Sequence, residues 1–527
     1  MRKKHFLFAS VLALLCGSSA LHAQDFKLTS SGYFKNQGVD IMAFDDIYPE
    51  GHQGGVCIIM NGHRVATNGD IRLEATPGQW QPVPKQLDRK LGDNSITATL
   101  CYPDSSRHLT GFNPMIYPDL HLIYTVNVES KGKNIEVTVD LDRPIPQEFI
   151  GKVGFNLEFF PGSLFGKPWI MDGQSGIFPQ QPNSPLMTTQ PNYLHTGNYH
   201  DGKQSLADMD KLIGKGYSPI VADDIISEPY AKGRKFTSRP DDPYNKVTIE
   251  SLSGDLQLFD GRMNHNNGWF VLRSNIKPGV TKGAVKWIIT PNVVADWMYQ
   301  PVIQTSQIGY HPAQDKEAVI EMDIRDNRKE TAQIIRIDAD GEKVVKNVTP
   351  ANWGKFLRYN YLKVDFTDVK EPGLYKIKYD TSVSPIFRID NDVYARGVWQ
   401  PVLEYFLPVQ MCHMRVNEKY RVWHDCCHMD DAQMAPAHNH IDGYDQKEGL
   451  SKFKPGEVVP GVNIGGWHDA GDFDLRIESQ AGESYILALA YEAFHPNLDV
   501  TSIDQINRVT EIHQPDGKND LLQQVEN

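Results

Sequence analysis

Two aspartates, Asp469 and Asp472, lie three residues apart in the sequence GGWHDAGDFD, which runs from residue 465 to residue 474. Glycines on both sides let the backbone adopt conformations that a Cβ would forbid, and they leave room for a bulky substrate. A carboxylate pair on one tight loop suits hydrolysis of a sugar linkage, in which one carboxylate activates a water molecule and a neighbour orients it. The alternative is an Asp/Gly-rich surface turn that binds calcium through hard oxygen ligands.

Thiol and imidazole side chains gather in the same part of the sequence, at Cys412, Cys426, Cys427, His428 and His468. Both groups are ligands of tetrahedral zinc. The alternatives are buried thiols or a disulfide bond between Cys412 and Cys427. His468 immediately precedes Asp469, and adjacent side chains of an extended chain point to opposite sides. A metal behind the loop would therefore hold the aspartates facing a cleft.

Three stretches resemble glycoside hydrolase family 9, and they follow the order of that family. Residues 307–312 (QIGYHP) resemble the start of the immunoglobulin-like module that precedes the catalytic barrel in one branch. Residues 427–432 (CHMDDA) resemble the CHxDDA segment, and residues 465–474 resemble the catalytic-base signature. The resemblance implies a cellulase-like, inverting hydrolase of β-linked glucan with an (α/α)6 barrel.

The resemblance also implies roles for individual residues. Asp472 would be the catalytic base, and Asp469 would help to hold the attacking water. Some members with the immunoglobulin-like module carry a structural zinc, whose matching ligands here are Cys412, Cys427, His428 and His468. Residues 473–476 depart from the family pattern, so the exact sugar is left open. The family's general acid, a glutamate near the end of its barrel, has no matching position.

The preceding residues predict two β-rich parts. Residues 24–299 contain strand-forming runs such as 56–60, 123–128 and 134–139, separated by Gly, Pro, Asn and Asp, which predicts a large β-sandwich of unassigned role. Residues 300–390 contain several short strands within about 90 residues, which predicts an immunoglobulin-like sandwich.

Residues 391–527 show a helical period. One helix is expected to begin near Asp390 and to run to Val409, and a second to cover residues 477–494 with Ile477, Ala481, Tyr485, Leu489 and Ala490 on one face. A third begins near Leu521. An (α/α)6 barrel has about twelve helices and needs several hundred residues. We therefore expect only the N-terminal part of a hydrolase domain, and a fragment that is inactive by itself.

The N-terminal residues indicate where the protein is located, and its net charge limits which partners it can have. Residues 1–23 have a basic start, an apolar centre and a small-residue end, which predicts a signal peptide and a secreted or periplasmic protein. An outer-surface lipoprotein attached through Cys16 is the alternative. No later run is apolar enough to span a membrane.

The net charge of −13 argues against a nucleic-acid partner, whereas the binding of a neutral polysaccharide does not depend on this charge. Cys57 and Cys101 are either a disulfide pair or two separate thiols.

Two functions remain after this reading. The first is a secreted inverting glycoside hydrolase that binds a polysaccharide or an oligosaccharide. The second is a non-catalytic secreted carbohydrate-binding or scaffold protein with a vestigial hydrolase end. The oligomeric state and the choice between endo and exo action are not specified by the sequence.

Overall fold

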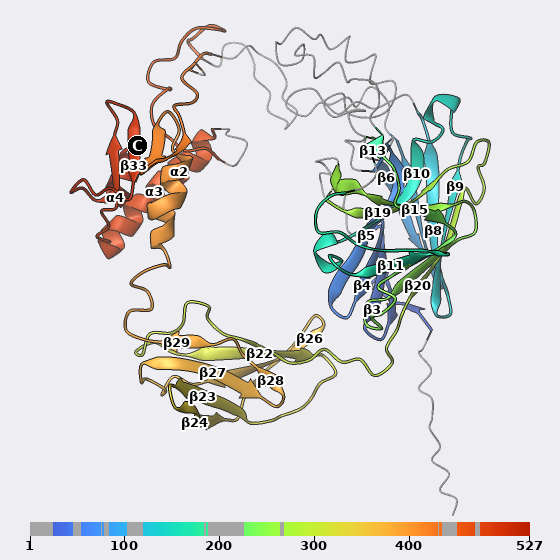
Figure 1. The fold of residues 1–527 in the computed structure, drawn as a ribbon, viewed down its shortest axis with the longest axis horizontal. Helices are drawn as coiled ribbons and strands as arrows, with labels where there is room; N and C mark the ends of the chain where they lie inside the picture. The colour runs from blue at the N-terminus through green and yellow to red at the C-terminus, as the bar shows by residue number, and fades with distance from the viewer. Residues whose placement is uncertain are drawn as a thin grey trace, which may run out of the picture. The chain divides into compact units, whose positions relative to one another are not determined.

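The computed structural model describes residues 25–45, 54–74, 76–77, 84–102, 120–183, 186–187, 226–263, 268–430, 432–434, 451–469 and 475–527. The chain divides into two compact units, residues 1–299 and 300–527 (Figure 1). The predicted signal peptide, residues 1–23, lies outside the described residues. Among the helices that are described, none combines the length and the hydropathy needed to cross a bilayer.

The first unit consists mainly of two nine-stranded antiparallel sheets. The first sheet has the order β1 (Lys27–Leu28), β2 (Phe34–Asn36), β3 (Val39–Ala43), β4 (Val56–Met60), β5 (His63–Leu73), β10 (Val153–Phe159), β19 (Phe270–Asn275), β18 (Leu256–Asp260) and β15 (Ala231–Gly233). The second has the order β12 (Gln174–Ile177), β11 (Pro168–Met171), β16 (Lys235–Ser238), β17 (Val247–Ser251), β20 (Val285–Pro291), β9 (Asn134–Leu141), β8 (Ile123–Lys131), β7 (Ser95–Cys101) and β6 (Lys85–Leu91). The smaller elements are β13 (Leu186–Met187), β14 (Ile226–Ser227) and the 3-10 turns η2 (Gln147–Phe149), η3 (Pro161–Ser163) and η5 (Gly261–Met263).

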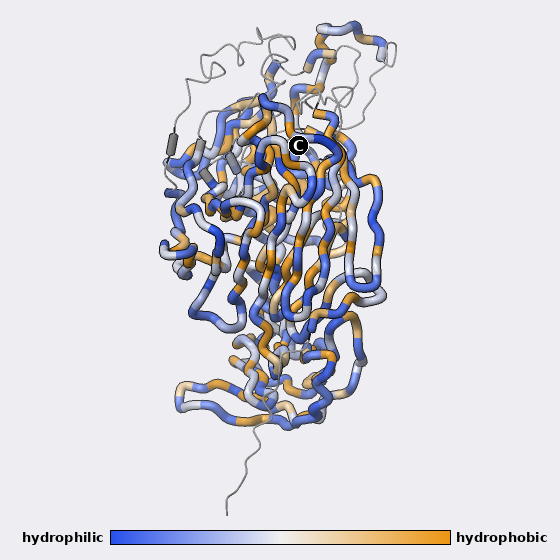
Figure 2. The backbone as a smooth tube through the Cα atoms, turned by 90° about the vertical axis from the view of Figure 1, so that its right-hand side faces the viewer, coloured by the Kyte–Doolittle hydropathy of each residue, from blue (hydrophilic) through white to orange (hydrophobic). Residues whose placement is uncertain are grey.

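Alternation along the strands builds the core between these two sheets. In β7 and β9 every second side chain is buried, as the period of two in a strand requires. Figure 2 shows this alternation as a change between hydrophobic and hydrophilic residues along the chain. Trp287 of β20 is fully buried and meets Phe155 of β10 edge to face, with ring centroids 5.0 Å apart. The predicted β-rich character of this region is confirmed.

A row of charged and amide side chains is buried along β5, β10 and β19, which the sequence reading did not anticipate. Asn156 of β10 pairs with Asp70 of β5 on one side and with Arg273 of β19 on the other. The three side chains therefore share one face of the sheet. Arg273 Nη1 lies 2.9 Å from Glu74 Oε1, which also accepts a 2.6 Å hydrogen bond from Asn156. Burial raises the pKa of Glu74 to about 7 although Arg273 opposes the shift, and burial also lowers the pKa of Arg273. Loss of hydration therefore outweighs the attraction within this pair.

The Glu74 carboxyl should make the first unit less stable at higher pH. Its pKa is higher in the folded state than the 4.5 of an ordinary glutamate, so the folded chain binds the proton more tightly. The raised pKa adds about 3 kcal/mol to the free energy of unfolding. This contribution is complete below about pH 4.5 and is lost as the pH rises through 7. In Glu74→Gln this part of the pH dependence should disappear. Calorimetric unfolding between about pH 5 and pH 8 measures it, with Glu129→Gln, a partly exposed acid of β8, as the control. An unchanged pH dependence in Glu74→Gln would contradict the shift.

The second unit begins with a sandwich of two small sheets, as the sequence predicts for an immunoglobulin-like domain. One sheet has the order β21 (Val302–Gln304), β22 (Glu317–Asp323), β26 (Tyr359–Asp365) and β25 (Ala351–Phe356). The other contains β24 (Gly341–Val348), β23 (Ala332–Asp338), β27 (Gly373–Tyr379) and β28 (Ser382–Val383), with β29 (Phe387–Ile389) also paired to β27. One apolar core that includes Ile320, Ile334 and Ile377 joins the two sheets.

The QIGYHP stretch closes this sandwich. Tyr310 forms a parallel bridge with Ile389, and its ring packs edge to face on Phe366 and Phe387. Gly309 has a φ of +103°, and a Cβ on it would lie 2.3 Å from the carbonyl oxygen of Arg388. The close approach of two backbone segments therefore requires glycine at this position.

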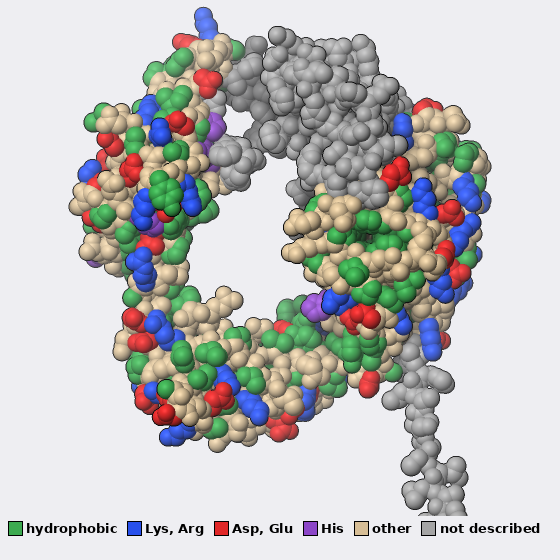
Figure 3. All heavy atoms as spheres, in the orientation of Figure 1, with side chains coloured by type: hydrophobic (Ala, Val, Ile, Leu, Met, Phe, Trp, Pro, Cys, Tyr) green, Lys and Arg blue, Asp and Glu red, His purple; other side chains and the backbone are tan. Residues whose placement is uncertain are grey.

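Residues after 390 form a small mixed α/β segment. Its elements are the π-helical turn η6 (Val402–Phe406), α2 (Leu407–Gln410), β30 (Arg415–Glu418), β31 (Arg421–His424), α3 (Ile477–Phe494), β32 (Thr501–Asp504), β33 (Val509–Ile512) and α4 (Asp520–Glu526). The strands form one sheet in the order β31-β30-β33-β32, with β30 parallel to β33. Lys, Arg, Asp and Glu side chains are interspersed over the face drawn in Figure 3.

The helical expectations for this segment are met in part. The predicted bounds of α3 are confirmed, and α4 covers the expected start near Leu521. The helix expected from Asp390 is wrong in its extent, because residues 391–399 form turns, and regular helical structure begins only next to Pro401. The four-stranded sheet was not predicted. The start of an (α/α)6 barrel is therefore not confirmed by the described elements.

Of the apolar face predicted for α3, only Ala490 contacts the core of this segment. Ile477 and Tyr485 are 73% and 66% exposed, whereas the helix contacts the core of this segment through Leu487, Ala490 and Tyr491. The helix is apolar on most of its surface, so the period of its hydrophobic residues does not select one face.

Candidate metal centre and catalytic loop

A short backbone pairing holds two distant segments together at the candidate site. Met411 and Trp467 form an antiparallel bridge. The amide of Cys412 donates to the carbonyl of Gly466 at 2.8 Å, and the amide of His468 donates to the carbonyl of Gln410 at 2.7 Å. Cys412 is the residue after Met411, and His468 is the residue after Trp467. Each of the two paired segments therefore contributes one of these side chains.

The glycines before Trp467 allow the chain to make this approach. Gly465 and Gly466 have φ angles of +70° and +83°, in the left-handed region. A Cβ on Gly465 would lie 1.8 Å from the carbonyl oxygen of Asn527, and one on Gly466 would lie 2.6 Å from Gln480 Oε1. The glycine pair is therefore needed both for the turn and for its close contacts with α3 and with Asn527, the residue at the end of α4.

Trp467 is part of the local core rather than an open stacking platform. Its side chain is 3% exposed, and its indole nitrogen donates to Gln524 Oε1 of α4 at 2.8 Å. The carbonyl of Trp467 accepts a 2.9 Å hydrogen bond from Gln480 of α3. Two helices therefore fix the backbone that carries His468 and Asp469.

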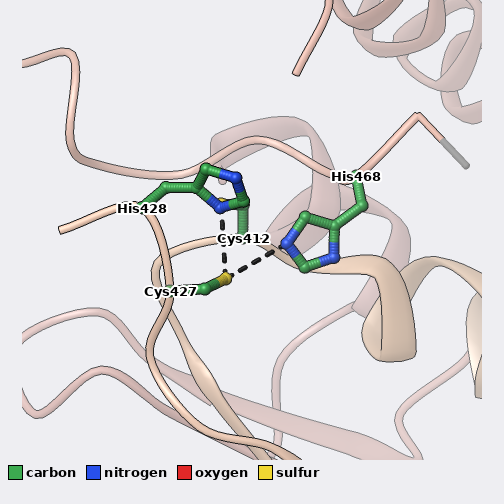
Figure 4. Close-up of side chains that lie close together, drawn as sticks. All are labelled: Cys412, Cys427, His428 and His468. Carbon is green, nitrogen blue, oxygen red and sulfur yellow. Dashed lines mark hydrogen bonds between the residues drawn. The ribbon is translucent and has the colours of Figure 1, made fainter. Parts of the chain in front are cut away.

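Four predicted ligand side chains meet behind this loop (Figure 4). Cys412, Cys427, His428 and His468 each offer one donor atom, and the four atoms lie within 4.8 Å of one another. The Sγ atoms of Cys412 and Cys427 are 3.6 Å apart. Cys412 Sγ lies 3.1 Å from His428 Nδ1, and Cys427 Sγ lies 3.1 Å from His468 Nε2.

These separations fit a tetrahedral metal. With Zn–S bonds of about 2.3 Å and Zn–N bonds of about 2.0–2.1 Å, tetrahedral angles place sulfurs about 3.8 Å apart and sulfur and nitrogen about 3.5 Å apart. The spacing of the four donors is close to this, without any disulfide among the five described cysteines. The cluster could hold zinc with all four positions filled by protein, which is the pattern of a structural site.

The histidine environment favours the neutral form that binds a metal. His468 is 4% exposed, and burial, together with the nearby His424, His428 and His413, lowers its pKa to about 4. At neutral pH its imidazole is therefore uncharged and available as a ligand.

His413 supports the cluster and was not assigned a role from the sequence. Its Nδ1 lies 2.8 Å from the carbonyl oxygen of Gly465, and its Nε2 lies 3.2 Å from that of His428. One buried imidazole therefore contacts both segments that carry the histidine ligands. Its contacts are non-local, so no signal in the sequence distinguishes it from a surface histidine.

The structure describes only one of the two predicted catalytic aspartates. Asp469 is exposed although the preceding His468 is buried, as expected for side chains on opposite sides of an extended segment. Its carboxylate lies 3.0 Å from Nε of Arg476, in an ion pair that remains partly open to solvent. Asp472 and Asp474 lie outside the described residues. The calcium alternative, which needs these aspartates together, gains no support.

Glu483 of α3 is a further acid near the loop that the sequence reading missed. Glu483 is exposed, and partial desolvation by its neighbours together with the nearby Asp469 raises the pKa of its carboxyl. The end of the loop therefore carries two interacting carboxyl groups and one guanidinium, from Arg476.

Comparison with known proteins identifies one part of the chain. Residues 298–384 match the cellulase N-terminal ig-like domain. This match covers the small sandwich described above, so the predicted immunoglobulin-like domain is confirmed. No curated protein matches the chain.

Solved structures that match in part include three glycoside hydrolases. They are a metagenome-derived glycoside hydrolase family 9 endoglucanase (25% identity, TM-score 0.33), a Zn-binding triple mutant of the family 9 endoglucanase J30 (23%, 0.29) and a family 9 protein of Bacteroides ovatus (20%, 0.31). The aligned regions cover 43%, 41% and 43% of this chain. They span 39%, 37% and 37% of the other chains, so this chain covers about two fifths of their length.

A pair of adjacent cysteines provides a matched test of the metal centre. Cys427 belongs to the cluster, whereas Cys426 is exposed and its Sγ lies 3.9 Å from the carbonyl oxygen of Arg508. We expect the purified chain to carry about one zinc ion, Cys427→Ser to lose most of it, and Cys426→Ser to retain it. Elemental analysis of the dialysed proteins measures the metal. Equal zinc in both variants would contradict the ligand set.

Proposed function

We propose that this chain is part of a secreted, inverting glycoside hydrolase that cleaves β-linked glucan in the manner of a cellulase. The observation that supports it most is the match of residues 298–384 to a cellulase N-terminal ig-like domain. It is followed by a segment in which a Cys/His cluster closes directly behind the exposed Asp469. Attachment of the module alone would be an argument by association, so the proposal depends on the loop as well.

In the proposed mechanism the loop supplies the base side of the reaction. Asp472 removes a proton from a water molecule, which attacks the anomeric carbon, and Asp469 accepts a hydrogen bond from the same water. A carboxylic acid on the opposite side of the sugar, about 6.5–9.5 Å away, protonates the leaving oxygen. Arg476 fixes the orientation of Asp469 through their 3.0 Å contact.

The metal in this proposal has a structural role. Zinc bound by Cys412, Cys427, His428 and His468 would supply cross-linking of three chain segments, and it would leave no ligand position for water. The residues themselves do the positioning. His468 anchors the backbone on the buried side, and Asp469 is presented on the exposed side.

The apolar surface of α3 supports a larger hydrolase domain. Ile486 and Phe494 are 65% and 81% exposed, in addition to Ile477 and Tyr485. Exposed apolar surface on this scale normally packs against other elements. We therefore propose that further helices cover α3 in the whole protein, and that one of them carries the general acid.

A non-catalytic carbohydrate-binding or scaffold protein is the second candidate. The ion pair of Asp469 with Arg476 favours it, because a carboxylate held by a guanidinium is less available to a water molecule. The two candidates differ in what Asp472 does, and a substitution at that position separates them.

Substitution of the proposed base should abolish hydrolysis. In a protein that carries the whole hydrolase domain, Asp472→Asn should lower kcat on soluble β-glucan by about 10²–10⁴-fold, because the attacking water is no longer deprotonated. Binding of the glucan should be retained. The control is Asp474→Asn, which changes an equal charge two residues away and should keep most of the activity. Full turnover by Asp472→Asn would refute the role of this residue.

The 527-residue chain alone should not hydrolyse β-glucan. Because the acid partner has no counterpart among its assigned residues, we expect no release of reducing sugar from soluble β-glucan above a heat-treated control. Cleavage of the polymer by the purified chain would show that the acid–base pair is already complete within it.

A further inference from the structure

A groove on the outer face of the second sheet is a candidate binding site of the first unit. It has a volume of about 420 Å³, and its lining residues are Lys133, Lys235, Lys246, Thr248, Glu250, Thr290, Pro291, Asn292 and Val293. Volumes of about 300–1,000 Å³ are typical of small-molecule sites. The strands β16, β17, β20 and β9 are neighbours in the sheet that carries the groove.

The register of these strands explains how the polar side chains come together. Thr248 of β17 lies opposite Thr290 of β20 on one side and opposite Thr237 of β16 on the other. Thr237 and Thr248 share a 3.1 Å hydrogen bond, and Thr290 donates to Asn134 Oδ1 at 2.9 Å. The intervening Val247 and Ile249 are buried, so the threonine row faces outward. The floor of the groove is thus a rigid, hydroxyl-bearing sheet surface.

The charges around this floor are mainly positive, in contrast with the molecule as a whole. The groove has three lysines and one glutamate, whereas the chain carries a net charge of −13. Among the described residues, none of the three lysines forms an ion pair, although Lys90 and Lys282 of the same unit pair with Asp88 and Asp140 at 2.6 and 3.0 Å. Lys235 lies opposite Glu250 across the strands, which leaves an excess of two positive charges.

We propose that this groove binds a carboxylated saccharide, such as an oligosaccharide of uronic acids. The ammonium groups would pair with the carboxylates of the ligand. Glu250 and the threonine hydroxyls would accept hydrogen bonds from the sugar hydroxyls, whereas a dense polyanion without donors would be repelled by Glu250. The proposal does not depend on the hydrolase function, because the groove belongs to the unit of residues 1–299.

Binding of tetragalacturonate to the whole chain, measured by calorimetry at low ionic strength, tests the groove. Its fully methyl-esterified form has the same rings and linkages without the charges. We expect the acid form to bind and the ester to bind at least about tenfold more weakly. Lys235→Gln combined with Lys246→Gln should weaken the acid form by a similar factor. The matched control is Lys90→Gln combined with Lys282→Gln, which removes two charges elsewhere in the unit and should leave binding unchanged.

Several results would overturn the proposal. One is that the chain does not bind tetragalacturonate, and another is that the ester binds as tightly as the acid. An equal loss in the control variant would mean that net charge, and not the groove, controls binding. Displacement by an equal concentration of tetrapolyphosphate would mean that the site recognises charge without the sugar. Thermal unfolding of each variant within a few degrees of the unsubstituted chain shows that the fold is retained.

Discussion

The pairing of residues 410–412 with residues 466–468 is the constraint on which the candidate site depends. Two backbone hydrogen bonds and the Met411–Trp467 bridge join segments that are far apart in the sequence. Cys412 and His468 come together only because of this pairing, and Cys427 and His428 then complete the donor set from the chain after β31. Around it, α4 holds the Trp467 indole, and α3 holds the carbonyl of the same residue.

A metal would complement this constraint rather than replace it. Thiolates brought within 3.6 Å of each other repel when they are ionised, and a divalent cation removes that repulsion. The paired backbone positions the donors, and the cation would compensate their charge. Asp469 lies on the other side of the loop. Adjacent side chains of an extended segment point in opposite directions, so Asp469 is exposed where His468 is buried.

Local patterns in the sequence predicted the local structure well. Alternating residues located strands such as β9 and β27, and the predicted bounds of α3 agree with those of the structure. The cluster itself was predicted through a family resemblance, since spacing alone left a disulfide or separate thiols open. The buried row around Glu74 could not be predicted, because its members are joined by strand registers and lie far apart in the sequence. The same is true of His413 and of the ion pair that engages Asp469, which depend on tertiary contacts. The turns at residues 391–399 show that a helical period of apolar residues does not by itself fix where a helix begins; regular helical structure starts only next to Pro401, a residue that is tolerated in the first turn of a helix.

The account is tested most directly by the metal coordination of the cluster. X-ray absorption at the zinc edge of the purified chain reports the identity and distance of the atoms bound to the ion. The account predicts two sulfur neighbours at about 2.3 Å and two nitrogen neighbours at about 2.0–2.1 Å, with no bound water. A first shell made mainly of oxygen, or a properly folded chain that takes up no zinc, would contradict it.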